Sequence, residues 1–142
     1  YYIWESAQLE FIDGVFKNLY LLQSKGFQLF IVSNQGGISR QLYTKENILK
    51  LHEELIETFR KNQIIISDIL FCPHHSELEK CLCRKPQSLM LDKLMARYEL
   101  NPLQSIMIGD SESDMESAAM AGIQGIRITP NQNMFPFISK LL

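Results

Sequence analysis

The fold is decided by an apolar run that ends in polar residues, FQLFIVSNQGG at residues 27–37. Residues 27–32 are nearly all apolar and partly β-branched, which is typical of a strand buried on both faces of a parallel sheet. The amides and glycines that follow predict a loop at the carboxyl end of this strand. Before it, Val15, Leu19 and Leu22 recur at helical spacing, which predicts a helix directly upstream.

Helices and strands alternate along the rest of the chain. Asp13 and Thr44 are expected as helix N-caps, whereas Gly26 and Gly122 are expected to end helices. In order, we expect a helix at 15–25, a strand at 27–32, a helix at 44–62, a strand at 65–71, a helix at 91–98, a strand at 105–108, a helix at 113–121, a strand at 125–128 and a helix at 135–142. This order predicts one α/β domain over residues 1–142, with a three-layer, Rossmann-like parallel sheet that binds ligands at the carboxyl ends of its strands.

The composition restricts the classes of function. The chain has 142 residues, of which 46% are hydrophobic, and a formal net charge of -2. It fits a single globular domain and offers no basic surface for nucleic acid or an anionic membrane. No apolar run reaches the roughly 18 residues that cross a bilayer. The three cysteines cannot all pair within one chain, which indicates a reducing compartment. We therefore expect a cytoplasmic monomer that acts on a small ligand.

A polar stretch at residues 72–85 holds all three cysteines and two of the three histidines. Three thiolates and one imidazole would suit a tetrahedral, structural Zn²⁺ site. The expected ligands are Cys72, His74, Cys81 and Cys83. Spacing alone leaves His75 open as the fourth ligand. The alternative is three ordinary thiols, because free cysteine commonly packs as a small hydrophobic residue. Four soft ligands so close together favour zinc.

Two carboxylates follow the strand expected at 105–108. Asp110 and Asp114 lie in the stretch GDSESD, where a strand ends and a helix begins. Carboxylates in such a position suit Mg²⁺, which takes oxygen ligands and retains water for a phosphate substrate. The alternative is helix capping, because Asp and Ser both favour the first turn of a helix. These residues alone do not decide between the two interpretations.

Two further clusters are suited to phosphate. Ser33, Asn34 and Gln35 offer a hydroxyl, amides and backbone N–H groups at a strand end, although a plain turn has the same composition. Arg84 and Lys85 add two cations, of which Arg can bind an oxyanion through two hydrogen bonds and Lys acts as a point charge. A lone basic pair usually lies on the exposed surface. This pair therefore indicates a phosphate site only together with the motifs around it.

The clusters occur in an order that resembles a known family. Taken together, the motifs IVSNQGGISR, CPHH followed by CLCRKP, and GDSESD are similar to those of the haloacid dehalogenase superfamily of phosphatases. Within it, the chain most resembles the zinc-bearing branch that contains D-glycero-D-manno-heptose 1,7-bisphosphate 7-phosphatase and the histidinol-phosphatases. The resemblance covers about residues 9–129 and includes FIDGV at residues 11–15, which is similar to the segment that opens the first helix there.

The resemblance implies a phosphomonoesterase that forms an aspartyl-phosphate intermediate and binds Mg²⁺. Ser33 and Asn34 would hold the transferring phosphoryl group, and Lys85 would neutralise its oxygens. Asp110 would ligate Mg²⁺, while Asp114 would orient that site or form a hydrogen bond with Lys85. The residues expected to contact the substrate are Gln35, Gly36, Arg84 and Ser111. The zinc loop would be structural, and no large cap domain is expected.

One part of the family pattern is absent from the 142 residues. The Asp-x-Asp-Gly motif, which supplies the nucleophile and the general acid/base, does not occur, and the similar stretch at 11–13 has Phe11 where the nucleophile belongs. We therefore expect the nucleophile on a strand upstream of Tyr1, or on a second chain. By analogy with the family, that strand lies between the strands ending at Val32 and Ile108, which would otherwise face a gap of unpaired backbone groups.

The resemblance also implies a class of substrate, a small phosphorylated metabolite. The 7-phosphate of D-glycero-D-manno-heptose 1,7-bisphosphate is the leading expectation, because the Gly-Ile-Ser stretch that ends at Arg40 and the pair His74-His75 favour the heptose branch. Histidinol phosphate is the alternative within the same branch. A different class also stays open: a catalytically silent domain that keeps zinc and binds phosphate ligands or a protein partner.

Overall fold

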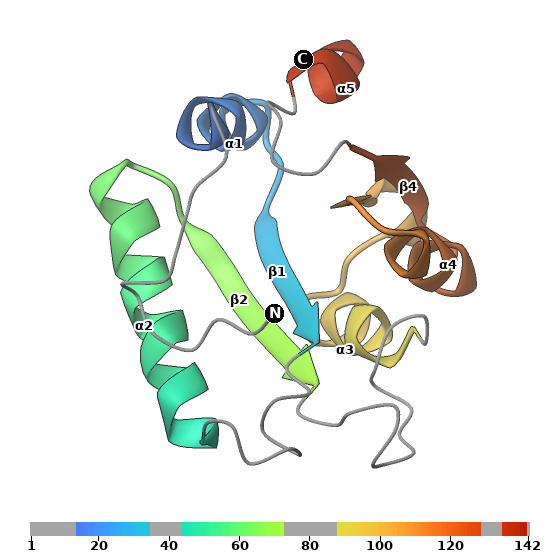
Figure 1. Ribbon diagram of the computed structural model, residues 1–142. Helices are drawn as coiled ribbons and strands as arrows, with labels where there is room; N and C mark the ends of the chain where they lie inside the picture. Colours follow the sequence, from blue (N-terminus) through green and yellow to red (C-terminus); the bar gives the residue numbers. More distant parts are fainter. Residues whose placement is uncertain (1–13, 35–43, 73–87, 129–134, 142) are drawn as a thin grey trace.

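The computed structural model describes residues 14–34, 44–72, 88–128 and 135–141 (Figure 1). Its elements are, in chain order, α1 (Val15–Ser24), β1 (Leu29–Asn34), α2 (Lys45–Lys61), β2 (Ile66–Cys72), α3 (Leu89–Arg97), the 3-10 helix η2 (Pro102–Gln104), β3 (Ile106–Gly109), α4 (Glu112–Met120), β4 (Gln124–Arg127), α5 (Phe135–Ile138) and the 3-10 helix η3 (Ser139–Leu141). The alternation of helices and strands is the one that the sequence predicts. In the described part of the chain, no helix is both long enough and apolar enough to cross a membrane.

The strands form two parallel ladders. β1 pairs with β2, and β3 pairs with β4. At their carboxyl ends the ladders place Asn34 opposite Cys72 and Gly109 opposite Arg127. Among the described residues, β1 and β3 each pair with one strand, so each has a second edge that no described strand covers. Figure 1 shows β4 on the opposite side of β1 from β2. The edges of β1 and β3 are the two that the sequence analysis expected to face a gap.

Helices cover both faces of the β1–β2 ladder. On one face, Leu29 and Ile31 of β1 join an apolar cluster with Phe59 of α2 and with apolar residues of α1. On the other face, Val32 packs against the cluster that contains Leu91 of α3. Because the side chains of a strand alternate between its two faces, these contacts place β1 between two helical layers. The predicted three-layer α/β arrangement is therefore present.

The β3–β4 ladder is covered by α4. Met107 of β3 packs with Ala118 of α4 and with Ile123, which directly precedes β4. Figure 1 shows α4 lying beside β4. Ala118 has no exposed surface, so the helix and the strands approach closely at this point. The ladder and its helix carry the carboxylates that the sequence analysis singled out, and the same cluster contacts Val32 of β1 and Leu91 of α3.

Local signals explain where the helices begin and end. Thr44 caps α2, since its Oγ1 accepts a hydrogen bond from the Asn47 N–H at 3.1 Å and its own N–H donates to Asn47 Oδ1 at 2.9 Å. Gly122 follows α4 with a φ of 74°, a left-handed conformation that glycine adopts without a Cβ clash. At α1 the N-cap position is Gly14, which forms no side-chain cap bond. The predicted cap, Asp13, lies outside the described residues.

A polar network connects β2 to α3. Asp68 Oδ2 accepts hydrogen bonds from the Tyr98 hydroxyl at 2.8 Å and from Arg97 Nη1 at 2.9 Å. Burial by itself raises the pKa of Asp68, but hydrogen bonds from Tyr98, Arg97 and the Ile69 N–H, with the charge of Arg97, hold that pKa below its usual value. Its hydrogen bond to Asp68 raises the pKa of Tyr98. The network therefore stabilises the folded chain when Asp68 is ionised.

His52 belongs to the interior of the fold. The side chain is buried on α2, and its ring meets that of Phe71 edge-on, with the ring centroids 5.3 Å apart. Burial lowers the pKa of His52, because the apolar surroundings disfavour the charged imidazolium. The imidazole therefore packs as a neutral aromatic group against β2.

Candidate functional site

The carboxyl ends of β1 and β2 meet at one edge of their ladder. The register places Ser33 opposite Phe71 and Asn34 opposite Cys72. These pairs bring together the first residues of two clusters that the sequence predicts at strand ends, the phosphate-binding cluster and the cysteine loop. The remainder of both clusters, at residues 35–43 and 73–87, lies outside the described residues.

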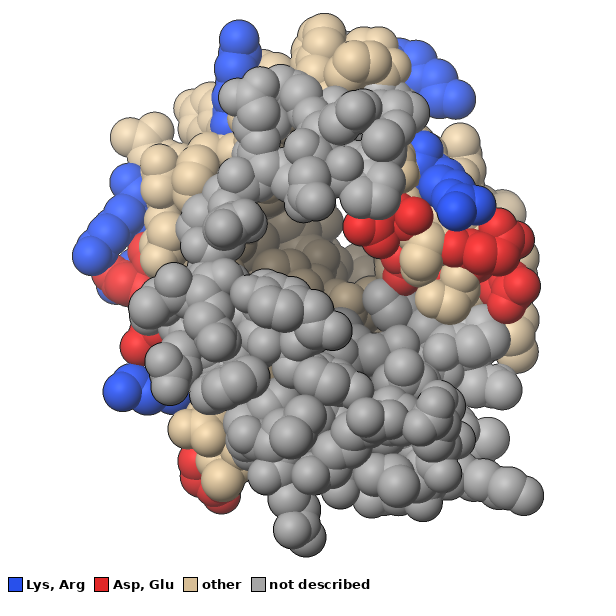
Figure 2. Space-filling model, in the orientation of Figure 1, with Lys and Arg blue, Asp and Glu red and all other residues tan. Residues whose placement is uncertain are grey.

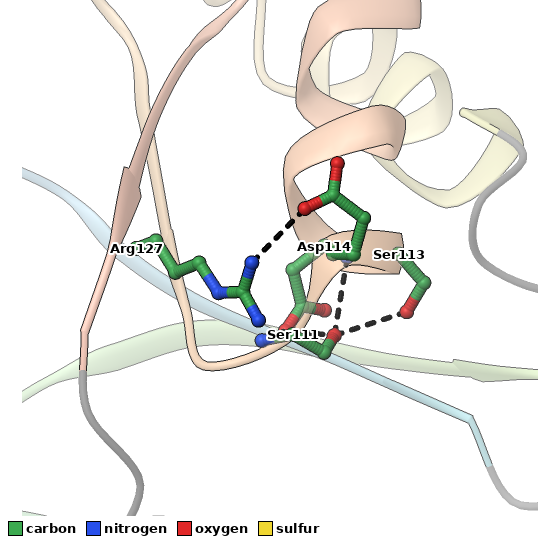
Figure 3. A network of polar contacts seen from close by, with 5 residues as sticks. Ser111, Ser113, Asp114 and Arg127 are labelled. Atoms are coloured by element: carbon green, nitrogen blue, oxygen red, sulfur yellow. Dashed lines mark hydrogen bonds and ion pairs between the residues drawn. The ribbon is translucent and has the colours of Figure 1, made fainter.

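The start of α4 forms a compact hydrogen-bonded cap (Figure 3). Ser111 is the N-cap residue, and its Oγ accepts a hydrogen bond from the Asp114 N–H at 3.2 Å. Asp114 Oδ2 in turn accepts hydrogen bonds from the Ser111 hydroxyl at 2.9 Å and from the Ser111 N–H at 3.3 Å. Ser113 Oγ lies 3.0 Å from Ser111 Oγ. Asp114 is only 5% exposed, and its carboxylate takes part in the cap of α4. The Mg²⁺ role that the sequence offers beside capping stays a prediction.

Gly109 allows the carboxyl group of Asp114 to approach the end of β3. A Cβ atom placed on Gly109 would lie 2.6 Å from both the Cβ and the Cγ of Asp114, well inside van der Waals contact. Glycine is therefore the residue that fits between the strand and the cap without moving the Asp114 side chain. The last residue of β3 and the first turn of α4 are locked together next to Asp110.

Asp110 is an exposed carboxylate at this edge. It follows β3 directly, its side chain is open to solvent, and it borders the cavity described below. Among the described residues, no group of three or more His, Cys, Asp and Glu side chains converges as a metal cluster. Asp110 therefore offers a single carboxylate, which fits Mg²⁺ because that ion commonly binds one or two carboxylates and completes its shell with water and phosphate oxygens.

A cation that the sequence analysis did not single out lies at the same edge. Arg127 stands opposite Gly109 at the end of β4, and its Nη1 lies 3.0 Å from Glu112 Oε2 (Figure 3). Both side chains are more than half exposed, so the pair contributes about 0–1 kcal/mol to stability. The sequence signal that could have identified Arg127 is its place as the last residue of a strand. Arg127 puts a positive charge beside Glu112 at the start of α4.

A cavity of about 660 Å³ lies between the two ladders. Residues 28–32 line it from the β1 side and residues 106–109 from the β3 side, and apolar side chains of α1 and α3 also contact it. Asp110 and Asp114 line the same cavity at the carboxyl end of β3. Figure 2 shows a hollow in the middle of this face of the molecule, with acidic side chains beside it. The carboxylates therefore border an apolar interior.

Part of the predicted site cannot be compared with the structure. The predicted residues outside the described part of the chain are Gln35, Gly36, His74, Cys81, Cys83, Arg84 and Lys85. Their proximity to Asp110 stays a prediction, and so does the zinc set. Of the predicted residues that the structure describes, it brings Ser111 and Asp114 into direct contact next to Asp110, and it pairs the Asn34 backbone with that of Cys72.

Comparison with known proteins extends this picture. The family model for the haloacid dehalogenase-like hydrolases matches residues 2–128. The chain belongs to this family. The family resemblance that the motifs carry in the sequence is thereby confirmed.

Two curated relatives in this hydrolase family are similar over most of the chain. The D-glycero-beta-D-manno-heptose-1,7-bisphosphate 7-phosphatase of Haemophilus influenzae is 35% identical over 128 residues, which cover 87% of this chain and 70% of that protein. The histidine biosynthesis bifunctional protein HisB of Campylobacter jejuni is 37% identical over 120 residues, which cover 84% of this chain and 34% of that protein. The chain thus matches about a third of the longer bifunctional protein.

A solved structure has the same fold. The crystal structure of D,D-heptose 1,7-bisphosphate phosphatase from B. bronchiseptica, complexed with magnesium and phosphate, superposes with a TM-score of 0.77 at 22% sequence identity. The match covers 91% of this chain and 71% of the other. The order of helices and parallel strands described above is therefore shared with that phosphatase.

Proposed function

We propose that the chain forms the greater part of a Mg²⁺-dependent phosphomonoester hydrolase that removes the 7-phosphate of D-glycero-D-manno-heptose 1,7-bisphosphate. The observation that carries the proposal is the exposed carboxylate of Asp110 at the carboxyl end of a parallel strand, in a chain of this hydrolase family. Ligands of open α/β sheets bind at that edge. The heptose bisphosphate phosphatase among the relatives supports the choice of substrate.

The proposed reaction proceeds through an aspartyl-phosphate whose nucleophile lies outside the 142 residues. A carboxylate oxygen attacks the phosphorus, the bond from phosphorus to the sugar oxygen breaks, and the leaving oxygen takes a proton from the general acid. Water then attacks the phosphorus of the acyl phosphate, which releases inorganic phosphate and restores the carboxylate. One difficult displacement is replaced by two easier ones.

Residues at three strand ends would hold the phosphoryl group. Ser33 and the Asn34 amide would bind its oxygens, and Lys85 would neutralise part of their charge. Gln35 and Gly36 would line the phosphate side, Ser111 would make a weaker phosphate contact, and Arg84 would contact the remainder of the substrate. The register that places Asn34 opposite Cys72 supports this proposal, because it brings the first of these residues to the strand that leads into the loop of Arg84 and Lys85.

Mg²⁺ would be held at the β3–α4 junction. Asp110 would be its carboxylate ligand, and the capped Asp114 would keep the junction rigid or form a hydrogen bond with Lys85. Bound there, Mg²⁺ would supply positive charge to the phosphate oxygens. The exposure of Asp110 and its place at the border of the cavity support this assignment.

Zn²⁺ would have a structural role in the loop at residues 72–85. Cys72, His74, Cys81 and Cys83 would be its ligands, and the closed site would stiffen the loop that carries Arg84 and Lys85. One zinc ion per chain, measured by elemental analysis of the natively expressed protein, is the expected result, and a zinc-free protein of full thermal stability would contradict this part of the proposal. We place the reaction in the cytoplasm. There a monomeric enzyme would act on a small phosphorylated metabolite.

Histidinol phosphate is the second candidate substrate, and the similarity to HisB favours it. Release of inorganic phosphate by the natively expressed protein, measured with each substrate in the presence of Mg²⁺, separates the two. Faster turnover of the heptose bisphosphate is expected, whereas faster turnover of histidinol phosphate would move the assignment to the second candidate. Hydrolysis of neither compound, together with binding of one of them, would favour the catalytically silent binding domain.

A further inference from the structure

We propose that Arg127 selects substrates by charge: it binds a second anionic group of the phosphomonoester and disfavours a substrate with an ammonium group in that place. This inference rests on the proposed function, since it concerns the substrate of the same site. It separates the two candidate substrates by their chemistry. The heptose bisphosphate carries a second phosphate, whereas histidinol phosphate carries an ammonium group.

The backbone fixes Arg127 next to the turn that carries Asp110. Arg127 stands opposite Gly109 in the β3–β4 register, and the N–H of the following residue, Ile128, donates a hydrogen bond to the Gly109 carbonyl at 2.9 Å. Neighbouring strands of a sheet lie about 4.8 Å apart. The Arg127 side chain therefore begins one strand spacing away from the residue that directly precedes Asp110.

The side chain of Arg127 lies on the face of the sheet that α4 covers. Gly125 comes two residues earlier on β4, and a Cβ placed there would lie 2.8 Å from Met115 Sδ of α4. Residues two apart on a strand share a face. In agreement, Arg127 Nη1 donates a hydrogen bond at 3.0 Å to Glu112 Oε2, on the first residue of α4. The guanidinium thus lies beside the first turn of α4, which begins two residues after Asp110.

The charges of that turn explain why a second anionic group needs Arg127. Residues 110–114 include three carboxylates, those of Asp110, Glu112 and Asp114, and no Lys or Arg. An anionic group brought to this stretch meets like charge, which weakens binding unless a cation compensates. Among the described residues, Arg127 is the basic residue that forms an ion pair with this stretch. Figure 2 shows basic side chains next to the acidic ones beside the hollow.

Arg127 can exchange Glu112 for a substrate phosphate. The bond to Glu112 uses one N–H of a guanidinium that has five, and the side chains are 56% and 69% exposed. An exposed ion pair of this kind is weak, whereas a guanidinium binds a phosphate through two parallel hydrogen bonds. A second phosphate would therefore displace Glu112. An ammonium group would instead be repelled by Arg127.

The test compares three substrates of the natively expressed protein: heptose 1,7-bisphosphate, heptose 7-phosphate, which lacks the second anionic group, and histidinol phosphate. Arg127→Gln should lower the ratio of kcat/KM for the bisphosphate to kcat/KM for the 7-phosphate about tenfold or more, mainly through KM. Arg127→Lys should restore part of that ratio. Arg127→Glu should raise kcat/KM for histidinol phosphate relative to the 7-phosphate. A merely structural role would lower all three values together and leave the ratios unchanged, which would overturn the proposal.

The matched control is Arg60→Gln, because Arg60 is an exposed arginine that forms an ion pair with Glu57 on α2. Its ratios should equal those of the parent. Turnover by the parent with unchanged ratios in Arg127→Gln would overturn the role of Arg127 alone. Hydrolysis of none of the three compounds would contradict the proposed function, and isothermal titration calorimetry then tests Arg127 separately. Binding of the bisphosphate about tenfold weaker in Arg127→Gln would support its role, and equal affinities would overturn it.

Discussion

The two ladders of this hydrolase differ in length and in what they carry. β1 and β2 have six and seven residues, and they pack with α1 and α2 around a cluster that includes the fully buried Ile64. β3 and β4 have four residues each, yet β3 is followed by Asp110 and by the Ser111–Asp114 capping box at the start of α4. The larger apolar cluster therefore belongs to the first ladder, whereas the carboxylates proposed for Mg²⁺ follow the second.

The largest effect on stability is expected from the core of the first ladder. Ile64→Ala should lower the free energy of unfolding by about 2–5 kcal/mol, because it removes buried methylene groups and leaves a cavity. The adjacent residue provides the control: Ile65 is 69% exposed, and Ile65→Ala should change stability by about 0.5 kcal/mol or less. Urea unfolding of both variants measures the difference. Equal losses would show that packing is not concentrated where we place it.

The second ladder should be sensitive at Gly109. Gly109→Ala should lower the free energy of unfolding by about 1–3 kcal/mol, because the new Cβ would collide with the Asp114 side chain. The matched control is Gly125→Ala on the paired strand, where the new Cβ meets the flexible side chain of Met115 and the cost should be smaller. Thermal unfolding followed by circular dichroism compares them. A larger loss at Gly125 would contradict the tight junction between β3 and α4.

In the described part of the chain, capping boxes begin α2 and α4. Variants of the two caps distinguish an effect on stability from an effect on catalysis. Thr44→Ala and Ser111→Ala should each cost about 1 kcal/mol, since each removes a side-chain acceptor at a helix start. Phosphate release per folded molecule should fall for Ser111→Ala alone, because Ser111 holds Asp114 beside Asp110. A steady-state assay of phosphate release by both variants measures the difference. Equal turnover of the two would contradict a role for Ser111 in catalysis.

The smallest effect is expected from the network between β2 and α3. Because hydrogen bonds hold the pKa of Asp68 below its usual value, the folded state binds this proton less readily than the unfolded state does. The stabilisation is therefore complete above the usual aspartate range near pH 4 and is lost as the pH falls through the lowered pKa. Tyr98→Phe should make the acid limb of the stability curve shallower. The free energy of unfolding is measured by urea titration between pH 5 and about 2. An unchanged pH dependence in Tyr98→Phe would assign the loss of stability in acid to other carboxylates.

Much of the fold is readable from short-range patterns in the sequence. The apolar run at 27–32, the cap at Thr44 and the stop at Gly122 each act through local backbone geometry, so they predict β1, α2 and the end of α4 to within about two residues. The pairing of strands into two ladders with a cavity between them depends on contacts far apart in the chain. The family resemblance, rather than any local pattern, led to the expectation of a gap there.

The site was predictable to a different degree. GDSESD identified the β3–α4 junction, but the division of roles between an exposed Asp110 and a buried Asp114 depends on how Ser111 turns into the helix. Arg127 escaped notice because a single arginine at the end of a strand has no motif around it. Its position opposite Gly109 becomes visible only once β3 and β4 are paired.

In the proposed hydrolysis, the edge next to β3 contributes Asp110 as the ligand of Mg²⁺. The most direct test follows heptose 1,7-bisphosphate by phosphorus NMR with the natively expressed protein and with its Asp110→Asn variant. Asp92→Asn, an exposed carboxylate of α3 outside the site, is the matched control. We predict loss of the 7-phosphate signal with the parent and with Asp92→Asn, and a rate reduced about 100-fold or more with Asp110→Asn at unchanged stability. An Asp110→Asn protein that hydrolyses the substrate at the parent's rate would contradict the account.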